Sequence, residues 1–315
     1  MKANMILQGD CLKKLKDIQE ESIDMCMTSP PYWALRDYGV KGQLGLESNF
    51  DKYVMKLCDI FDEVKRILKK QGTCWVNLGD TYYTKSGNDF LNDKINSNSR
   101  VKKIGINKAN QIRGKGLLKS KNLALIPFRF ALEMQKRGWI IRNVIIWHKP
   151  NCMPSSVKDR FTVDFEYLFF FSKNKKYYFK TQREPHKISS IKRTFSSWNG
   201  HREPKSSYCG MNIKNMCHPQ GRNKRTVWKI TTKPFRDAHF AVYPEEFCEI
   251  PIKAGCPENG IVLDPFFGAG TTGLVALKQN KKFIGIELNS KYIKIAQKRL
   301  QGVENGIPNP TAIRV

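Results

Sequence analysis

Short apolar segments alternate with helical patterns over both ends of the chain, and this alternation limits the fold more than any other feature. Strands separated by helices return to one sheet in the same direction, so the pattern predicts an α/β fold with a mostly parallel sheet and helices on both faces. The expected strands are Met5–Gly9, Ile23–Ser29, Thr73–Gly79, Trp139–Trp147, Glu166–Ser172, Gly260–Asp264 and Lys282–Glu287. The expected helices are Phe50–Lys70, Pro127–Lys136, Pro244–Ala254, Thr271–Gln279 and Ser290–Leu300.

Basic residues are concentrated in two parts of the chain. The 315 residues include 55 lysines and arginines against 28 acidic residues, a formal charge of +27, and segments 85–121 and 173–236 carry 23 of these excess charges. Such a concentration favours a binding surface for a polyanion over a merely solvated face. The second segment also places rings among the cations, a mixture that suits phosphate contact and base stacking: Phe195, Trp198, His201, Tyr208 and Trp228.

The nine cysteines have irregular spacings and do not predict a disulfide framework. Cys209, Cys217 and His218 lie in one basic stretch, but no Cys-x-x-Cys pair accompanies them, so unpaired thiols are favoured over a metal site. No apolar run is long enough to span a bilayer, and Asp10 interrupts the short run at the start. We therefore expect a soluble protein of a reducing compartment, with no membrane partner and no bound metal.

A glycine-rich loop follows a strand in the segment Ile261–Gly273. Gly268, Gly270 and Gly273 satisfy the spacing G-x-G-x-x-G, which alone also fits a nicotinamide cofactor. The acid and the aromatic pair before the glycines favour instead a cofactor with a cationic amino-acid end and no pyrophosphate. The next strand ends at Glu287, where an acid suits the ribose diol of either cofactor.

A rigid turn, Ser29-Pro30-Pro31-Tyr32, follows the strand Ile23–Ser29 directly. Ligands of open parallel sheets bind at such strand ends. The Ser29 hydroxyl and the Pro30 carbonyl can accept hydrogen bonds, and Tyr32 offers a flat ring beside them. Two acceptors on the N–H groups of an exocyclic base amine would localise its lone pair and aim it at a methyl sulfonium, provided that the base has left the duplex stack.

Other residues carry weaker signals. No cysteine follows a proline, which disfavours methylation of carbon 5 of cytosine, because that reaction needs a cysteine nucleophile. His148 follows a strand and either touches DNA or is a hydrogen-bonded structural histidine. Asp80 ends another strand and either faces the rim of the site or caps the turn that follows.

The motifs TSPPYW (28–33) and DPFFGAGT (264–271) resemble the catalytic and cofactor motifs of amino-methylating DNA methyltransferases. The order, with the catalytic motif first, is similar to that of the permuted group called beta. GDCLKKL, SKNLALIPFR and HFAVYPEEF are also similar to segments of that group. The match covers nearly the whole chain apart from the two basic segments.

The resemblance implies a seven-stranded, Rossmann-like methyltransferase sheet, S-adenosyl-L-methionine as cofactor and double-stranded DNA as partner. It implies a catalytic domain over 1–172 and 237–315, with 85–121 as a basic loop insertion, and a target-recognition region over 173–236. It assigns catalysis to Ser29, Pro30, Pro31 and Tyr32. It assigns cofactor binding to Asp10, Thr28, His239, Phe240, Ala241, Asp264, Pro265, Phe266, Gly268, Gly270, Thr271 and Glu287. Within the basic region, we expect Lys224 and Arg225 to contact DNA phosphates.

The residue before Pro-Pro-Tyr bears on the base. In the family, serine is commoner in enzymes that methylate cytosine N4, and Asp or Asn in those that methylate adenine N6. Ser29 therefore favours site-specific methylation of cytosine N4, with adenine N6, an RNA-directed relative and an inactive DNA-binding relative as alternatives. The resemblance implies a cytoplasmic enzyme encoded by a bacterium, an archaeon or a phage. It leaves open a homodimer, and a cognate restriction endonuclease that acts on the same site without stable association.

Overall fold

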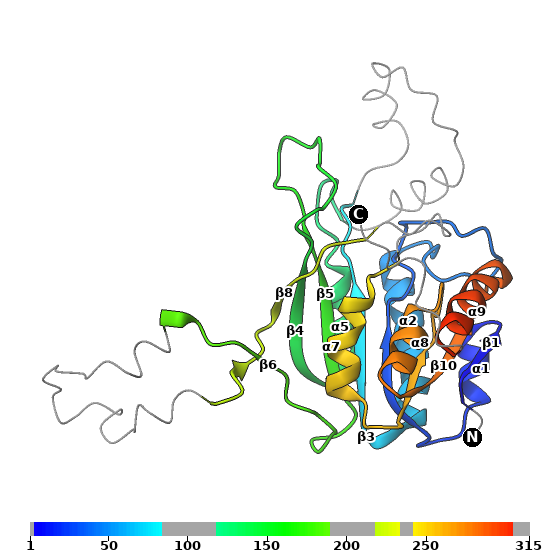
Figure 1. Cartoon of the computed structure of the whole chain (residues 1–315). Coiled ribbons are helices and arrows are strands. Elements are labelled where there is room, and N and C mark those ends of the chain that lie inside the picture. Colours follow the sequence, from blue (N-terminus) through cyan, green and yellow to red (C-terminus); the bar gives the residue numbers. More distant parts are fainter. Residues whose placement is uncertain (1–2, 84–117, 190–217, 234–241, 305–315) are drawn as a thin grey trace, which may run out of the picture. The chain divides into compact units, whose positions relative to one another are not determined.

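The computed structural model describes residues 3–83, 118–189, 218–233 and 242–304 (Figure 1). The chain forms two compact units, one of residues 1–179 with 227–315 and one of Lys180–Thr226. The first unit contains the sheet and all the helices discussed below, and we call it the catalytic unit. No helix of the described residues is long and apolar enough to cross a membrane.

The sheet of the catalytic unit has the strand order β1-β10-β9-β2-β3-β5-β4-β8. All neighbouring strands pair in parallel except β5, which is antiparallel to both β3 and β4. All seven expected strands are present, and a short eighth strand, β8, extends the edge beside β4. The strands are β1 Met5–Gln8, β2 Ile23–Thr28, β3 Leu68–Leu78, β4 Ile140–His148, β5 Phe165–Ser172, β8 Val227–Lys229, β9 Ile261–Asp264 and β10 Lys282–Glu287.

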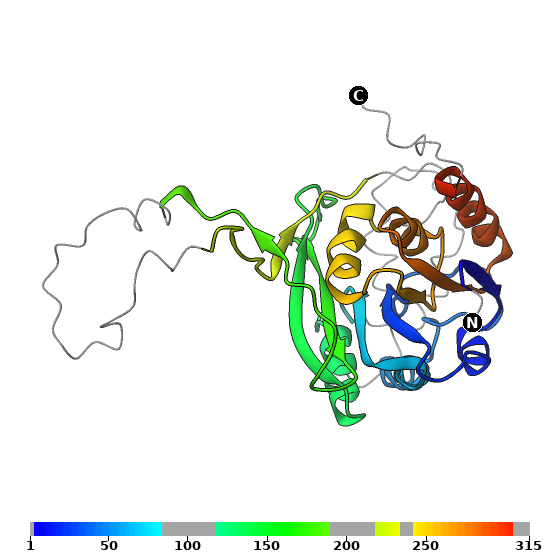
Figure 2. The same ribbon diagram turned by 60° about the horizontal axis from the view of Figure 1, so that its bottom comes forward.

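Helices cover both faces of the sheet, as expected (Figure 2). One face carries α1 (Cys11–Lys16), α2 (Phe50–Ile67) and α5 (Ile126–Lys136). The other carries α7 (Glu245–Gly255), α8 (Thr271–Lys278) and α9 (Ser290–Glu304). The short helix α1 was not expected, because six residues are too few to show a helical period; the Asp10 side chain caps it by accepting from Lys13 N at 3.0 Å.

Alternation of side chains divides the core into these two layers. Every residue of β2 is buried, as in a central parallel strand. Met25 and Met27 face the layer of α7, α8 and α9, whereas Cys26 between them faces the other layer. Ile23 also faces that other layer, because the pairing of β2 with β3 shifts register between Ile23 and Met25. Burial on both sides explains why β2 is mostly apolar, with Asp24 as its one charged residue.

The parallel strands bring their carboxyl ends to one edge of the sheet. Gln8 pairs with Glu287, Gly285 pairs with Asp264, and Thr28 pairs with Val76. Sites at these strand ends therefore lie side by side although the chain visits them far apart in sequence.

The unit Lys180–Thr226 has a small antiparallel ribbon, β6 (Arg183–Glu184) with β7 (Arg222–Asn223). Arg222 Nε lies 2.8 Å from Glu184 Oε1 across the ribbon. This unit is shorter than the predicted region 173–236, because residues 173–179 and the residues from Val227 onward belong to the catalytic unit. Trp228 is one of the aromatic residues that lie among the lysines and arginines of the predicted region. It is only 6% exposed and packs in the core. Phe195, Trp198, His201 and Tyr208 lie outside the described residues.

Candidate active site at the strand ends

The Ser29–Tyr32 turn leaves the end of β2 and is fastened to α2 and to the loop before it. The Tyr53 hydroxyl donates to the Pro31 carbonyl at 2.8 Å. Trp33, buried at the base of the turn, donates from Nε1 to the Glu47 carbonyl at 3.1 Å. The turn is therefore held rigidly on its far side, and Ser29 and Tyr32 remain partly exposed.

Asn77, near the end of β3, orients both of these side chains. Its Nδ2 donates to the Tyr167 carbonyl at 3.1 Å, which turns Oδ1 towards the Ser29–Tyr32 turn, the candidate catalytic turn. Oδ1 then accepts from Ser29 Oγ at 3.1 Å and lies 3.0 Å from the oxygen of the Tyr32 hydroxyl, whose one proton is donated to Glu166. A serine hydroxyl has one proton; when that proton is given to Asn77, the lone pairs of Oγ are left to accept a hydrogen bond from a substrate.

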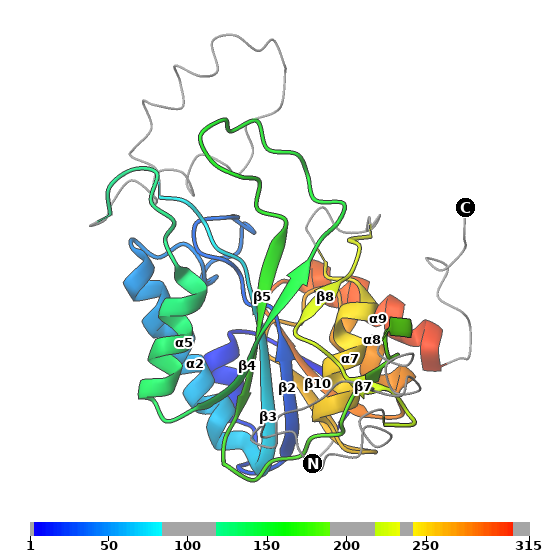
Figure 3. The ribbon, with the colours of Figure 1, turned by 90° about the vertical axis from the view of Figure 1, so that its left-hand side faces the viewer.

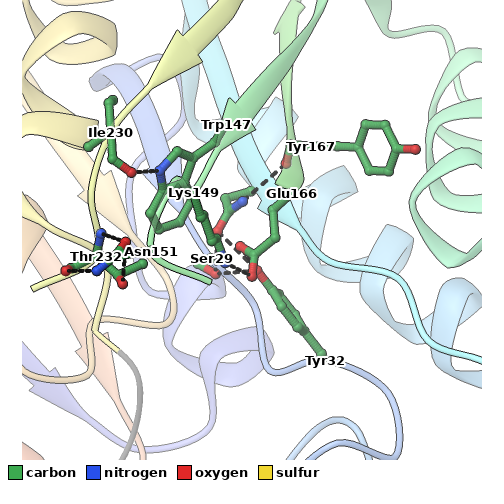
Figure 4. A network of polar contacts seen from close by, with 10 residues as sticks. Ser29, Tyr32, Trp147, Lys149, Asn151, Glu166, Tyr167, Ile230 and Thr232 are labelled. Atoms are coloured by element: carbon green, nitrogen blue, oxygen red, sulfur yellow. Dashed lines mark hydrogen bonds and ion pairs between the residues drawn. The ribbon is translucent and has the colours of Figure 1, made fainter. Parts of the chain in front are cut away.

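Glu166 and Lys149 complete this arrangement (Figure 4). The Tyr32 hydroxyl donates to Glu166 Oε2 at 2.8 Å, and Lys149 Nζ forms an ion pair with Glu166 Oε1. Lys149 Nζ also lies 4.3 Å from the centre of the Trp147 ring. Burial, and then the charge of Glu166, raise the pKa of Tyr32 well above its ordinary value, so the phenol keeps its proton. We call Ser29, Tyr32, Asn77, Lys149 and Glu166 the Ser29 cluster.

Gly79 makes room for the ring of Tyr32. A Cβ at position 79 would lie 2.7 Å from Tyr32 Cε2, closer than side chains approach one another. The tyrosine ring is thus packed against backbone on one side and tethered at its hydroxyl, which fixes the plane of the ring.

Sequence reasoning missed Asn77, Lys149 and Glu166, although each stands at the end of an expected strand. It pointed instead to two of their neighbours. His148 Nε2 lies 3.3 Å from Asp164 Oδ2, so it has a structural partner. Asp80 Oδ1 accepts from Thr81 N at 2.8 Å and from Ile126 N at 3.1 Å, which matches the capping alternative.

Asp264, at the end of β9, is bonded on both oxygens. Oδ1 accepts from Thr28 Oγ1 at 2.6 Å and from Phe266 N at 3.0 Å. Oδ2 accepts from Thr272 Oγ1 at 2.6 Å and from the Tyr243 hydroxyl at 3.2 Å. Asp264 is 1% exposed, and burial raises its pKa against the effect of these hydrogen bonds. We call Thr28, Tyr243, Asp264 and Thr272 the Asp264 cluster.

The Asp264 cluster refines the predicted cofactor contacts. Asp264 and Thr28 hold each other and the start of the glycine loop, so their side chains support the loop. Their assignment to cofactor binding stays a prediction. Pro265 and Thr271 are also buried, and Thr271 Oγ1 accepts from Arg299 at 3.0 Å. Phe266 remains half-buried.

Gly268 and Gly270 of the glycine loop differ in the space that a side chain would find there. Gly268 has φ +52°, and a Cβ there would meet no atom closer than the Phe266 carbonyl at 4.0 Å, so the space above it is open. Gly270 has φ +79°, and a Cβ there would lie 2.9 Å from the Cβ of Ala296 on α9. Gly270 therefore makes room for α9, whereas Gly268 faces open space. The assignment of both glycines to cofactor binding stays a prediction.

Glu287 ends β10 beside this open space. Its Oε2 accepts from Gly268 N and its Oε1 from Asn289 N, both at 2.7 Å. Burial raises the pKa of Glu287 above its ordinary value. Each carboxylate oxygen keeps a second lone pair, so ribose hydroxyls still find acceptors there. Asp10, half-buried, follows the neighbouring strand β1.

An aromatic pair near Glu287 escaped the sequence analysis. The rings of Tyr38 and Tyr292 meet edge to face, with centroids 6.5 Å apart. Burial raises the pKa of Tyr292 to about 12, and the charge of Glu287 acts in the same direction on both tyrosines. These rings come from the loop after the catalytic turn and from α9, and neither segment contains a motif that marks them.

The remaining predicted residues lie elsewhere. Lys224 and Arg225 belong to the unit Lys180–Thr226, where Arg225 Nε lies 3.8 Å from Glu184 Oε1. His239, Phe240 and Ala241 lie outside the described residues, as do Cys209 and Cys217. Across the described ranges, no three His, Cys, Asp or Glu side chains gather in a way that could hold a metal ion.

Known proteins resemble this chain over nearly its full length. A family model described as DNA methylase, of the N6/N4 methyltransferases, matches residues 23–298. The type II methyltransferase M.Cfr9I of Citrobacter freundii is 39% identical over 96% of this chain and 89% of its own. M.SmaI of Serratia marcescens, also a type II methyltransferase, is 38% identical over 94% of this chain and 90% of its own.

Solved structures show the same fold. The PvuII DNA methyltransferase, described as cytosine-N4-specific, superposes with a TM-score of 0.62 at 20% identity, over 95% of this chain and 86% of its own. A putative DNA modification methylase of Thermus thermophilus, complexed with S-adenosyl-L-methionine, has a TM-score of 0.57 at 22% identity, over 94% and 93% of the two chains. The glycine loop, the catalytic turn and the family match over residues 23–298 lead to one conclusion: the chain belongs to the N6/N4 DNA methylase family.

Proposed function

We propose that the protein transfers the methyl group of S-adenosyl-L-methionine to N4 of a cytosine that has been turned out of double-stranded DNA. The observation that carries the proposal is the orientation of Ser29: its hydroxyl lies 3.1 Å from Asn77 Oδ1, which frees its lone pairs for an amine N–H. The PvuII DNA methyltransferase, a fold neighbour described as cytosine-N4-specific, supports the same base.

The glycine-loop edge fits the cofactor. Open space above Gly268 and the remaining lone pairs of Glu287 suit the close approach of a nucleoside. Asp10 and Phe266 flank the same strand ends, and we propose that these four residues hold the cofactor on the frame provided by the Asp264 cluster. When bound, S-adenosyl-L-methionine supplies an electrophilic methyl group.

The chain's own residues then prepare the amine. Ser29 Oγ and the Pro30 carbonyl accept its two N–H groups and withdraw its lone pair from conjugation with the ring. Tyr32, held by Asn77 and Glu166, gives the base a fixed aromatic surface. The reaction needs positioning and polarisation, and no covalent enzyme intermediate is involved.

Glu166 acts through Tyr32, and we propose it as a positioning residue. Lys149 and Glu166 side chains are 18% and 19% exposed, so the ion pair is partly shielded and holds its geometry better than a surface pair. Without this pair, the Tyr32 hydroxyl would lose its strongest acceptor and the ring its tether.

We further propose that the region 173–236 recognises the target sequence, with Lys224 and Arg225 on phosphates. The type II relatives suggest a restriction endonuclease that acts on the same site without binding this protein. A cytoplasmic enzyme would meet both cofactor and DNA. Light scattering of the purified protein, alone and with DNA, decides between a monomer and a homodimer.

The test is methylation-sensitive sequencing of DNA from cells that express the protein, with mass spectrometry of the nucleosides. The proposal expects N4-methylcytosine at one recurrent sequence. If N6-methyladenine is found instead, the protein acts on the alternative base. If the DNA contains no modified base, the protein is an inactive DNA-binding relative.

A further inference from the structure

The loop between β4 and β5 exposes apolar side chains to an unusual degree. Every residue from 153 to 163 is exposed. Phe161 is 96% exposed and Met153 is 89% exposed, more than any other large hydrophobic side chain of the described residues. Single apolar residues on a surface are normal, but this one loop exposes four of them: Met153, Val157, Phe161 and Val163.

Both ends of this loop belong to the Ser29 cluster. Lys149 begins the loop and Glu166 follows it, and these two residues form the ion pair that holds Tyr32 (Figure 4). Lys149 N donates to the Asp164 carbonyl at 2.7 Å, which closes the base of the loop. Phe161 stands five residues before Glu166, so its Cα lies within roughly 17 Å of that of Glu166. Figure 3 shows the loop projecting beyond the ends of β4 and β5.

Residues next to Phe161 hold the loop to the rest of the protein, whereas the Phe161 side chain itself is exposed to solvent. Arg160 lies over the Tyr82 ring at 3.7 Å, and Asp159 forms an ion pair with Lys121 at 2.6 Å. Tyr82 follows β3, the strand that carries Asn77. Phe161 is therefore presented from an anchored segment at the edge of the sheet that holds the catalytic turn.

The charge around Phe161 identifies the partner. Lys158 and Arg160 are exposed cations beside it, and the one acid between them is paired with Lys121. An aromatic ring among cations suits a surface that is anionic outside and aromatic within, which describes duplex DNA better than a protein or a membrane.

We propose that Phe161 inserts into the base stack of the DNA duplex at the position that the target base leaves when it turns into the site. The ring would replace the stacking contacts that the duplex loses, and so lower the cost of extruding the base. This proposal rests on the proposed function, because it presumes a base-extruding methyltransferase.

The test compares two substrates. Each is a duplex that carries the mapped methylation site, one fully paired and one with a mismatch opposite the target base, which lowers the cost of extrusion. Phe161→Ala should lower kcat/KM on the paired duplex roughly tenfold or more and on the mismatched duplex much less. Phe161→Trp, which keeps a ring, should retain most of the activity.

Leu132→Ala is the matched control, since Leu132 is 59% exposed on α5 and lies outside the site. This variant should have the kcat/KM of the wild type on both duplexes. The thermal midpoint of Phe161→Ala should equal that of the wild type, because the ring packs against no core.

Two results would overturn the proposal: unchanged kcat/KM of Phe161→Ala on the paired duplex, or an equal loss on both duplexes. The equal loss would place Phe161 against the extruded base or the phosphates rather than in the stack. Failure of the proposed function itself is a separate result, because the wild-type protein would then methylate neither duplex.

Discussion

The Asp264 cluster and the Ser29 cluster are built from the same kinds of side chain: a carboxylate, a tyrosine hydroxyl and an aliphatic hydroxyl. They meet in the chain at Thr28 and Ser29, which belong to one cluster each. Asp264 is 1% exposed and all its partners come from the protein, whereas Ser29 and Tyr32 are partly exposed and keep acceptor capacity. Similar residues at neighbouring strand ends therefore differ in burial, and we propose that one cluster supports the fold and the other faces the substrate.

Removal of the buried carboxylate should have the largest effect, and it should be an effect on stability. Asp264→Ala leaves three hydroxyls and the Phe266 amide without this acceptor, and we expect the free energy of unfolding to fall by roughly 3–5 kcal/mol. Denaturant titration measures this. Asp10→Ala is the control: it removes only a helix cap and should cost about 1 kcal/mol. Equal losses in the two variants would show that the buried cluster has no special structural role.

Removal of the tethered ring should act on turnover instead. Tyr32→Ala takes away the surface for the base, and we expect kcat to fall about 100-fold or more. Cofactor affinity should change little, since Tyr32 lies in the other cluster. Tyr32→Phe keeps the ring and loses only the bonds to Asn77 and Glu166, so its loss should be smaller. If Tyr32→Phe were as slow as Tyr32→Ala, the hydroxyl and not the ring would be the functional part.

The two glycines of the loop should separate packing from binding. Gly270→Val forces a side chain against Ala296, and we expect a loss of stability of about 2 kcal/mol. Gly268→Ala meets open space, so it should cost about 1 kcal/mol through its positive φ and mainly weaken cofactor binding. Thermal unfolding and calorimetry with S-adenosyl-L-methionine give the two readouts. A stable Gly270→Val protein that has lost cofactor affinity would instead show that the cofactor approaches Gly270 closely.

The smallest expected effect is on the pH dependence of cofactor affinity. Burial raises the pKa of Glu287 above its ordinary 4.5, so this carboxylate takes up its proton at a pH where exposed glutamates are still charged. Protonation removes acceptors for ribose hydroxyls. Affinity should therefore be full above the raised pKa and decline several-fold as the pH falls through it. Calorimetry between neutral and mildly acidic pH checks this, and Glu287→Gln should show a flatter profile; identical profiles would exclude Glu287 as the titrating group.

The parts of the molecule that depend on local pattern could be predicted from the sequence. Strand β2 is visible because burial on both faces makes every residue apolar or small, apart from Asp24. The catalytic turn is visible because its prolines follow that strand. The Ser29 cluster could not be completed, since Asn77 and Glu166 meet Tyr32 only through the antiparallel pairing of β3 with β5.

The burial of Asp264 could not be predicted from the sequence either. An acid that ends a strand suggests a ligand contact, and for Glu287, which lies beside the open space above Gly268, this stays the prediction. Asp264 has the same local setting, but its partners Thr28 and Tyr243 come from distant positions and enclose it. No residue next to Asp264 in the chain reveals this enclosure.

The most direct test of the account is a single-turnover methyl-transfer rate for Ser29→Ala, measured beside its affinity for S-adenosyl-L-methionine. We propose that Ser29, whose proton goes to Asn77, accepts a hydrogen bond from the amine, so we expect a rate at least roughly 100-fold lower, with a cofactor Kd within about twofold of the wild type. The thermal midpoint should not change. A rate close to that of the wild type, or a loss that appears wholly in the cofactor Kd, would contradict the assignment of the chemistry to the Ser29 cluster.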